Sequence, residues 1–347
     1  MNNPQNPLTV QAWMYPDCLA DDEITDGRII DVLKPEYYRL QDNGTLQLLK
    51  ATCNTYSHEH AAFVKKYSTQ QFVTISGHAS GIDALSKSRT LRAAFLSTMI
   101  SFLQSSGFTG VEIDFEGFGG WSPQVYTGYK DFIGILGNAL HAHKYKLMID
   151  GPAISDARYQ SYYPWRWEEF NALPVDYLVV MAYDQMYDQG AGTPVATLEW
   201  IKNTCQWVKS KITDHSRIVV GLNSYGYTGK TGSYDVKLNT YNQSEQLPGF
   251  STAKRDESSG EMKWERDGTS YFFSDSETLR RKVAVVEQCG LKAISVWHLG
   301  GNQWISQGEQ SQEPTTDAVA LTSAQIKNFH RIFTPDQIEV IKKIVFE

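Results

Sequence analysis

The feature that most constrains this chain is a regular alternation of short apolar runs, rich in β-branched residues, with longer amphipathic segments. Runs of this kind are typical of strands buried on both faces, and helix-length connections indicate that such strands run parallel. The expected strands are Thr9–Tyr15, Ile29–Leu33, Gln71–Ser76, Gly110–Phe115, Lys146–Asp150, Val175–Met181, Arg217–Asn223 and Ala293–Trp297. Eight alternating units predict a closed (β/α)8 TIM barrel.

The connecting segments carry the end signals of helices. The expected helices include Thr90–Ser105, Val125–His143, Thr197–Lys211 and Ser276–Gln288. Residues 274–277 (SDSE) supply N-cap chemistry for the last of these, and Gly290 supplies its C-cap. A doubly wound open sheet is the main structural alternative. It is disfavoured because no glycine-rich phosphate loop follows the first strand.

Composition along the chain divides it into a barrel, an insertion and a tail. The catalytic barrel is expected to span residues 1–305, with a small insertion at 229–271 between its seventh and eighth strands. That stretch is rich in Gly, Ser, Thr, Tyr and charged residues. The composition of residues 306–347 predicts a polar linker and a C-terminal helical tail, packed on the barrel. Thr334 and Pro335 begin the tail's last helix.

Composition also excludes several functions. The net charge of −7, without a clustered basic face, argues against a nucleic-acid partner. No stretch approaches the roughly 18 consecutive apolar residues of a membrane span. The eight histidines and four cysteines lack metal-ligand spacing, so we expect no metal and no cofactor. The sequence does not decide whether Cys18 and Cys53 form a disulfide. It also leaves localisation undecided, because the first residues do not resemble a signal peptide although substrates of the expected class lie outside cells. We expect a monomer.

Three carboxylates alternate along the expected fourth strand. Glu112, Asp114 and Glu116 fall at every second position, so they share one face, with neighbours roughly 6–7 Å apart. The alternative is an amphipathic strand with a solvated charged face. In a closed barrel, however, that face is the interior, where three carboxylates cannot all ionise cheaply. At least one acid is therefore expected to hold a proton near neutrality, as cleavage of a glycosidic bond requires.

Four sequence blocks in order resemble glycoside hydrolase family 18, the chitinase-type barrels. Residues 109–116 (TGVEIDFE) are similar to the family's DGxDxDxE signature on the fourth strand. Ser76-Gly77 resembles the SxGG block on the third strand, and residues 181–184 (MAYD) resemble the MxYD block on the sixth. Trp297, ending the eighth strand, matches the tryptophan under the reacting sugar. The resemblance runs from about Thr9 to Gly301.

The resemblance implies a retaining, substrate-assisted mechanism. Glu116 would protonate the leaving oxygen while the sugar's own 2-acetamido oxygen attacks the anomeric carbon. Asp114 would orient and stabilise the resulting oxazolinium ion. Tyr183 would hydrogen-bond the acetamido group, with Asp184 assisting. The implied partner is therefore a β-linked polysaccharide or oligosaccharide that contains N-acetylglucosamine (GlcNAc).

The sequence departs from the family pattern at two positions. Thr109 replaces the first aspartate and is interpreted as a packing change, whereas Glu112 replaces the second and keeps a supporting carboxylate behind Asp114. Aromatic residues near the strand ends are candidate sugar-binding residues, with core packing as the alternative for each. They are Trp13, Tyr15, Trp121, Tyr225 and Trp297.

Rival functions remain at this point. A glycosidase acting on chitin or chito-oligosaccharides is the first hypothesis, and a peptidoglycan N-acetylglucosaminidase is the alternative. A chitinase-like lectin would bind such glycans without cutting them, but inactive relatives usually lose the residue at Glu116. An unrelated barrel enzyme such as an aldolase would need a strand-end lysine or a phosphate-binding loop, and we find neither. Endo or exo action depends on loops such as 229–271.

Overall fold

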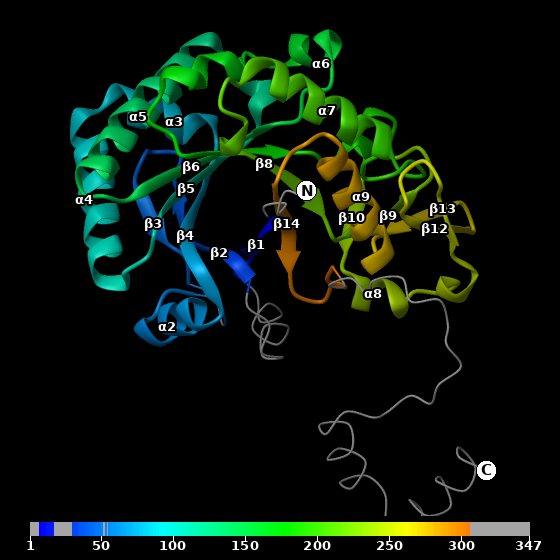
Figure 1. Ribbon diagram of the computed structural model, residues 1–347. Coiled ribbons are helices and arrows are strands. Elements are labelled where there is room, and N and C mark those ends of the chain that lie inside the picture. The colour runs from blue at the N-terminus through cyan, green and yellow to red at the C-terminus, as the bar shows by residue number, and fades with distance from the viewer. Residues whose placement is uncertain (1–6, 17–29, 51–52, 54, 306–347) are drawn as a thin grey trace, which may run out of the picture. The chain divides into compact units, whose positions relative to one another are not determined.

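The computed structural model describes residues 7–16, 30–50, 53 and 55–305. Its main sheet has eight parallel strands in the order β1-β14-β8-β7-β6-β5-β4-β2, and β1 also pairs with β2, which closes the barrel (Figure 1). These strands are β1 (Thr9–Met14), β2 (Ile30–Leu40), β4 (Ser68–Gly77), β5 (Gly110–Phe115), β6 (Lys146–Pro152), β7 (Tyr177–Met181), β8 (Ile218–Asn223) and β14 (Ala293–Leu299). The predicted TIM barrel is confirmed.

The strands are buried on both faces, as their apolar composition predicts. All six residues of β8 are buried, as are five of the six in β5. The largest difference from the sequence reading concerns β2, which continues to Leu40 rather than ending at Leu33. The extension contains Lys34, Glu36 and Arg39, whose charges conceal the strand pattern. An antiparallel edge strand, β3 (Leu46–Leu48), pairs with its far end.

Helices cover the outside of the barrel (Figure 1). They are α2 (His58–Lys66), α3 (Ala79–Lys87), α4 (Arg89–Ser106), α5 (Pro123–Ala142), α6 (Ala157–Tyr162), α7 (Leu198–Lys211) and α9 (Ser276–Gln288). Their ends follow the expected chemistry. Asp275 forms a capping box with Thr278 at the start of α9, and Thr197 caps α7 through the backbone N–H of Trp200.

The predicted insertion is a separate small sheet. Its antiparallel strands lie in the order β10-β9-β13-β12-β11. They are β9 (Gly226–Lys230), β10 (Val236–Asn239), β11 (Lys254–Arg255), β12 (Met262–Arg266) and β13 (Thr269–Phe273), with the short helix α8 (Tyr241–Glu245) between β10 and β11. The sheet begins three residues before and ends two residues after the predicted range of 229–271. The linker and helical tail lie outside the described residues, as does Cys18.

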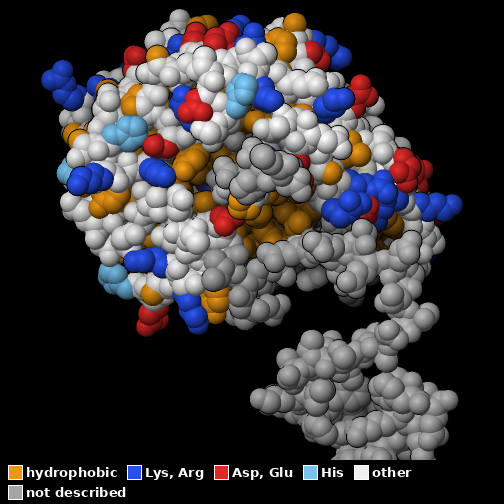
Figure 2. Space-filling view, viewed as in Figure 1, with side chains coloured by type: hydrophobic (Ala, Val, Ile, Leu, Met, Phe, Trp, Pro, Cys, Tyr) orange, Lys and Arg blue, Asp and Glu red, His pale blue; other side chains and the backbone are white. Residues whose placement is uncertain are grey.

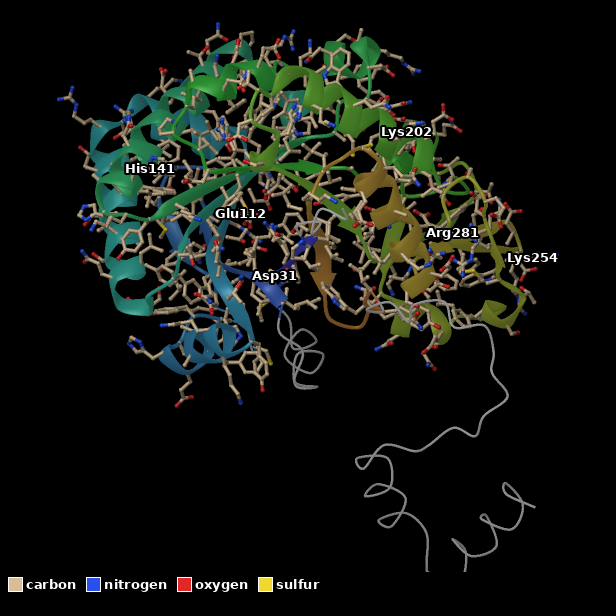
Figure 3. All side chains as sticks on the ribbon, in the orientation of Figure 1. Asp31, Glu112, His141, Lys202, Lys254 and Arg281 are labelled. Carbon is tan, nitrogen blue, oxygen red and sulfur yellow. The ribbon has the colours of Figure 1, made fainter. Side chains whose placement is uncertain are left out.

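Charged side chains of both signs mix over the face in Figure 2, around a hollow lined with apolar side chains. In Figure 3, Lys202, Lys254 and Arg281 lie on the peripheral elements, whereas Glu112 lies within the ring of strands. No helix within the described part of the chain is long and apolar enough to cross a membrane.

The packing of α5 generates a matched test of the fold. A Cβ atom on Gly137 would lie 2.1 Å from the carbonyl oxygen of Pro174, whereas one on Gly134 would meet only Leu173 Cδ2, at 3.8 Å. We expect Gly137→Ala to lower the free energy of unfolding by about 1–3 kcal/mol through overpacking. Gly134→Ala should instead raise it by about 0.5–1 kcal/mol, because alanine favours the helix. Urea denaturation measures both, and equal effects would contradict this account of the packing.

Candidate active site

The carboxylate strand β5 divides its side chains as alternation predicts. Val111, Ile113 and Phe115 are fully buried in the main apolar core, outside the ring of strands. The acids take the interior face, with Glu112 completely buried and Asp114 half-buried. Glu116 follows the last strand residue and lies at the mouth of the barrel, where the active sites of TIM barrels form.

Glu112 forms the floor of this site through an ion pair. Its Oε1 atom lies 2.5 Å from Lys34 Nζ on β2, and both side chains are completely buried. Its Oε2 atom accepts hydrogen bonds from Trp13 Nε1, at 3.0 Å, and from the Thr74 hydroxyl. The Lys34 ammonium also lies 3.3 Å from the centre of the Trp13 ring. Glu112 is thus held by an ammonium, an indole and a hydroxyl.

Asp114 and Asp150 are the acids above and beside this ion pair. Burial, followed by the charges on Glu116 and Glu112, raises the pKa of Asp114 well above its usual value. Burial and the charge on Glu112 raise the pKa of Asp150 in the same way. Lys34 lowers both pKa values, but it does not cancel these effects. Asp114 Oδ1 accepts no hydrogen bond from any described residue.

Glu116 has a raised pKa at the border of the cleft. Burial, with the charges on Asp184 and Glu36, raises its pKa to about 7. Its backbone is anchored on two sides, because its N–H donates to Gly77 O at 2.9 Å and its carbonyl accepts from Trp121 Nε1 at 3.0 Å. The pKa places Glu116 where a general acid for neutral pH needs to be.

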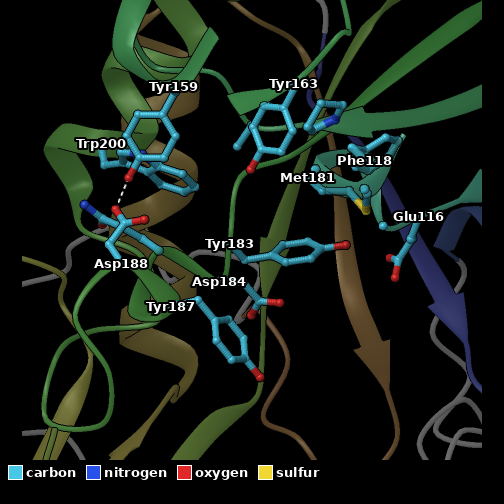
Figure 4. Close-up of a pocket in the computed structure, with 16 residues that line it drawn as sticks. Glu116, Phe118, Tyr159, Tyr163, Met181, Tyr183, Asp184, Tyr187, Asp188 and Trp200 are labelled. Atoms are coloured by element: carbon cyan, nitrogen blue, oxygen red, sulfur yellow. Dashed lines mark hydrogen bonds between the residues drawn. The ribbon is translucent and has the colours of Figure 1, made fainter. Parts of the chain in front are cut away.

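Tyr183 and Asp184 follow β7 and face the same mouth. In Figure 4 the Tyr183 ring extends from β7 toward Glu116, with Asp184 beside it. Asp184 adopts a left-handed backbone conformation, with φ of 68°. Its Oδ1 atom accepts hydrogen bonds from the hydroxyls of Tyr225 and of Tyr227, the latter at 2.8 Å. Burial raises the pKa of Asp184, and these two hydrogen bonds lower it.

Two cavities meet at Glu116, Tyr183 and Asp184. The first, of about 530 Å³, lies among the segments that follow β5, β6 and β7. Its aromatic lining includes Tyr159, Tyr163, Tyr187 and Trp200 (Figure 4). The second, of about 350 Å³, contains Asp114, Trp297, Tyr15 and Tyr225 as well as Glu36, Arg39 and Ser76 from the ends of β2 and β4. We name these the aromatic pocket and the acidic pocket.

The structure separates the five aromatic candidates into two groups. Trp297, Tyr15 and Tyr225 line the acidic pocket together, with the Tyr15 and Tyr225 rings centred 6.0 Å and 5.2 Å from Trp297. Trp13 and Trp121 lie inside the protein, with only 4% and 5% of their surfaces exposed. Trp13 contacts Lys34 and Glu112 below the site, and Trp121 packs on Phe118, Tyr129 and Trp165.

Several site residues were missed by the sequence reading. Lys34 and Glu36 on β2 and Asp150 on β6 all lie near the carboxylates of β5. The sequence does contain a signal for Lys34 and Glu36. They stand at alternate positions along β2, so both side chains point to the same face of the strand, which here is the interior of the barrel. Tyr227, which follows the same strand as Tyr225, lines the acidic pocket with it, and its hydrogen bond to Asp184 could not be read from the sequence. Among the residues described, no cluster of three or more His, Cys, Asp or Glu could hold a metal ion.

Comparison with known proteins places this barrel in a family. The model of the glycosyl hydrolases family 18 matches residues 30–302. The chain belongs to this family. Among curated proteins it resembles the glycosylase YvbX of Bacillus subtilis, at 24% identity over 256 residues, which cover 69% of this chain and 73% of YvbX.

Solved structures share the same fold. A chitinase from Chromobacterium violaceum superimposes with a TM-score of 0.72 at 20% identity, covering 88% of this chain and all of that one. The spore cortex-lytic enzyme SleL of Bacillus cereus gives a TM-score of 0.69 at 16% identity, covering 87% of this chain and 73% of that one. At these identities the structural likeness concerns the fold.

The buried ion pair under the site can be tested directly. We expect Lys34→Met to lower the free energy of unfolding by about 3–5 kcal/mol, because Glu112 would be left buried without its counter-charge. Adding Glu112→Gln should restore part of the loss. Lys87→Met is the matched control, since Lys87 pairs with Asp83 at the surface and should change stability little. Equal losses at positions 34 and 87 in urea denaturation would contradict this account.

Proposed function

We propose that this protein is a retaining, substrate-assisted glycosidase that hydrolyses β-linked, GlcNAc-containing glycans, with chitin or chito-oligosaccharides as the first choice of substrate. The observation that carries the proposal is the arrangement at the barrel mouth. Glu116, with a pKa of about 7, faces a cavity that also holds Asp114, Tyr183, Asp184 and Trp297. One acid is therefore available to donate a proton, and other polar groups surround the sugar's position.

Each site residue has a separate task in this mechanism. Glu116 donates its proton to the glycosidic oxygen as the bond to the anomeric carbon breaks. The substrate's acetamido oxygen attacks the anomeric carbon from the other face, so the protein supplies no nucleophile. Asp114 accepts a hydrogen bond from the acetamido N–H and stabilises the positive charge that develops on the oxazolinium ring. Glu116, now ionised, takes a proton from the water that opens this ring, which restores the starting state.

Tyr183 and Asp184 hold the acetamido group. The Tyr183 hydroxyl lies on the side of the site toward Glu116 (Figure 4), where it can donate a hydrogen bond to the acetamido oxygen. Asp184 is fixed by Tyr225 and Tyr227, which keeps its charge close to the reacting carbon. Burial with nearby carboxylates raises the pKa of Tyr183 well above its usual value, so this hydroxyl keeps its proton throughout the reaction.

The two cavities indicate how the substrate is oriented in the cleft. Trp297 lies in the acidic pocket, so the reacting sugar is assigned there, with its apolar face on the indole ring. Glu116 borders both cavities, and the general acid must lie between the reacting sugar and the leaving group. The leaving group therefore occupies the aromatic pocket, where Tyr159, Tyr163 and Trp200 provide apolar surface for further sugars.

Peptidoglycan is the second candidate substrate. It is supported by the similarity of the fold to a spore cortex-lytic enzyme, whose TM-score is close to that of the chitinase. A lectin without activity is disfavoured because Glu116 and Asp114 are both present and both have raised pKa values. Release of a fluorophore from a chitotrioside conjugate, compared with release of reducing ends from peptidoglycan, distinguishes the two substrates.

Substitution of the acid tests the mechanism. We expect Glu116→Gln to lower kcat on a chito-oligosaccharide by at least about a hundredfold, because the amide cannot protonate the leaving oxygen. The dissociation constant of the same oligosaccharide, measured by isothermal titration calorimetry, should change less than tenfold, because the side chain keeps its shape. A wild-type protein that binds the oligosaccharide but releases no product between pH 4 and pH 8 would be a lectin, contrary to the proposal.

The raised pKa of Glu116 predicts the pH dependence. The acid must be protonated at the start of the reaction, and its pKa lies at about 7. We therefore expect kcat/KM to fall as pH rises through about 7, giving the alkaline side of a bell-shaped profile. Initial rates in a constant-ionic-strength buffer series measure this. Activity that stays level up to pH 9 would show that proton donation by Glu116 does not limit the reaction.

A further inference from the structure

Glu36 is a carboxylate of the cleft that the mechanism above does not use. It lies on β2, with 13% of its side chain exposed, and forms a small network with two neighbours. Its Oε1 atom accepts hydrogen bonds from Ser76 Oγ at 2.6 Å and from an Arg39 guanidinium nitrogen at 3.3 Å. Arg39 Nε also donates to Ser76 Oγ at 3.1 Å. All three residues line the acidic pocket.

The backbone of β2 directs Glu36 into that pocket. The pairing of β2 with β4 shifts register between Glu36 and Tyr38, an irregularity that re-aims side chains next to active sites. Tyr37, on the opposite face, is fully buried in the outer core, whereas Glu36 follows Lys34 toward the lumen. The network uses only Oε1 among the hydrogen bonds between described residues, so Oε2 is available as an acceptor.

More acidic than basic side chains line the acidic pocket. Four carboxyl groups line it, from Glu36, Asp114, Glu116 and Asp184, and Arg39 is the one Lys or Arg side chain among its described lining residues. Arg39 is nearly half exposed, with 45% of its side chain accessible, so water screens its charge. The charge of Glu36 reaches the reacting groups, since it contributes to the raised pKa of both Asp114 and Glu116.

This arrangement suits an uncharged sugar and opposes an anionic one. A buried carboxylate oxygen accepts a strong hydrogen bond from a sugar hydroxyl. A sugar that carries its own carboxylate, as muramic acid does, would face four carboxyl groups in a partly desolvated space. Under the proposed function the reacting sugar lies in this pocket on Trp297, so this discrimination would act on the sugar whose bond is cleaved and on the one bound beside it.

We propose that Glu36 is a specificity-determining residue of the cleft. Its Oε2 atom accepts a hydrogen bond from a hydroxyl of an uncharged N-acetylhexosamine in the acidic pocket, and its charge excludes sugars that carry a carboxylate. Ser76 and Arg39 are positioning residues that hold this carboxylate in place. The inference rests on the proposed function and narrows its substrate class to neutral GlcNAc oligomers.

Binding measurements in an inactive background test this role. Isothermal titration calorimetry of Glu116→Gln would use two probes, chitotetraose and a peptide-free oligosaccharide of alternating GlcNAc and muramic acid with free carboxylates. Adding Glu36→Ala should weaken chitotetraose binding about ten- to a hundredfold, as expected for a lost hydrogen bond to a charged group. Adding Glu36→Gln, which keeps an acceptor oxygen, should weaken it less than about tenfold.

The second probe separates a specificity role from a structural one. Glu36→Gln removes the charge and should shift the preference toward the acidic oligosaccharide by at least about tenfold, relative to Glu116→Gln alone. A role only in the folding of β2 would weaken both probes equally, and that result would overturn the inference. Glu257→Gln is the matched control, since Glu257 is 79% exposed and pairs with Arg281 at the surface, so neither constant should change.

The inference and the proposed function fail in different ways. If the wild-type protein, with Glu116 intact, neither cleaves nor binds chito-oligosaccharides, both the proposed function and the inference that rests on it are wrong. If the wild-type enzyme cleaves chitotetraose but the Glu36 variants keep its affinity and the same preference between probes, only the inference is wrong. Thermal unfolding of each variant verifies folding, and Glu36→Gln keeps the test valid if Glu36→Ala does not fold.

Discussion

The buried ion pair between Lys34 and Glu112 is the interaction on which the rest of the site depends. A closed barrel encloses the inward side chains of its strands, and here β5 places carboxylates in that space. Two unpaired charges in such a place would cost several kcal/mol each. Lys34 Nζ lies 2.5 Å from the Glu112 carboxylate, and Trp13 and Thr74 donate hydrogen bonds to the same group. The carboxylate is thereby held at the floor of the barrel.

That carboxylate affects the groups above it. Asp114 lies between Glu112 and Glu116, so burial and two neighbouring carboxylates raise its pKa. Glu116 lies nearer the solvent, and burial with neighbouring charges raises its pKa to about 7. Under the proposed function, the proton needed for glycosidic cleavage is held where a substrate can reach it, and the deeper carboxyl groups orient and stabilise the reacting sugar.

The departures from the family signature have different consequences. Thr109, in place of the first aspartate, accepts a hydrogen bond from the backbone N–H of Gln71 at 3.2 Å through its hydroxyl, which links β5 to β4. This contact joins neighbouring strands, which is what the interpretation of Thr109 as a packing change predicts. Glu112, in place of the second, forms a completely buried ion pair with Lys34. The departure at position 112 and the presence of Lys34 are parts of one arrangement.

The sequence by itself determined the barrel and placed three carboxylates on one face of its fourth strand. Alternation along residues 110–116 was enough to assign faces, because side chains on a strand can point in only two directions. The insertion and the helix α9 also followed from local composition and capping. The functions of Trp13 and Trp121 did not follow, because an aromatic side chain at a strand end fits a core and a sugar cleft equally well.

Only the tertiary structure decided which residues meet across the barrel. Lys34 and Glu112 are 78 positions apart, and Tyr227 reaches Asp184 from the inserted sheet. Glu36 on β2 meets Ser76 on the neighbouring strand β4, where the pairing of the two strands is irregular. These contacts depend on barrel closure, strand stagger and a local irregularity, which local residue patterns do not encode. The pattern of the sequence placed each carboxylate on a face, and closure of the barrel determined its neighbours and its burial.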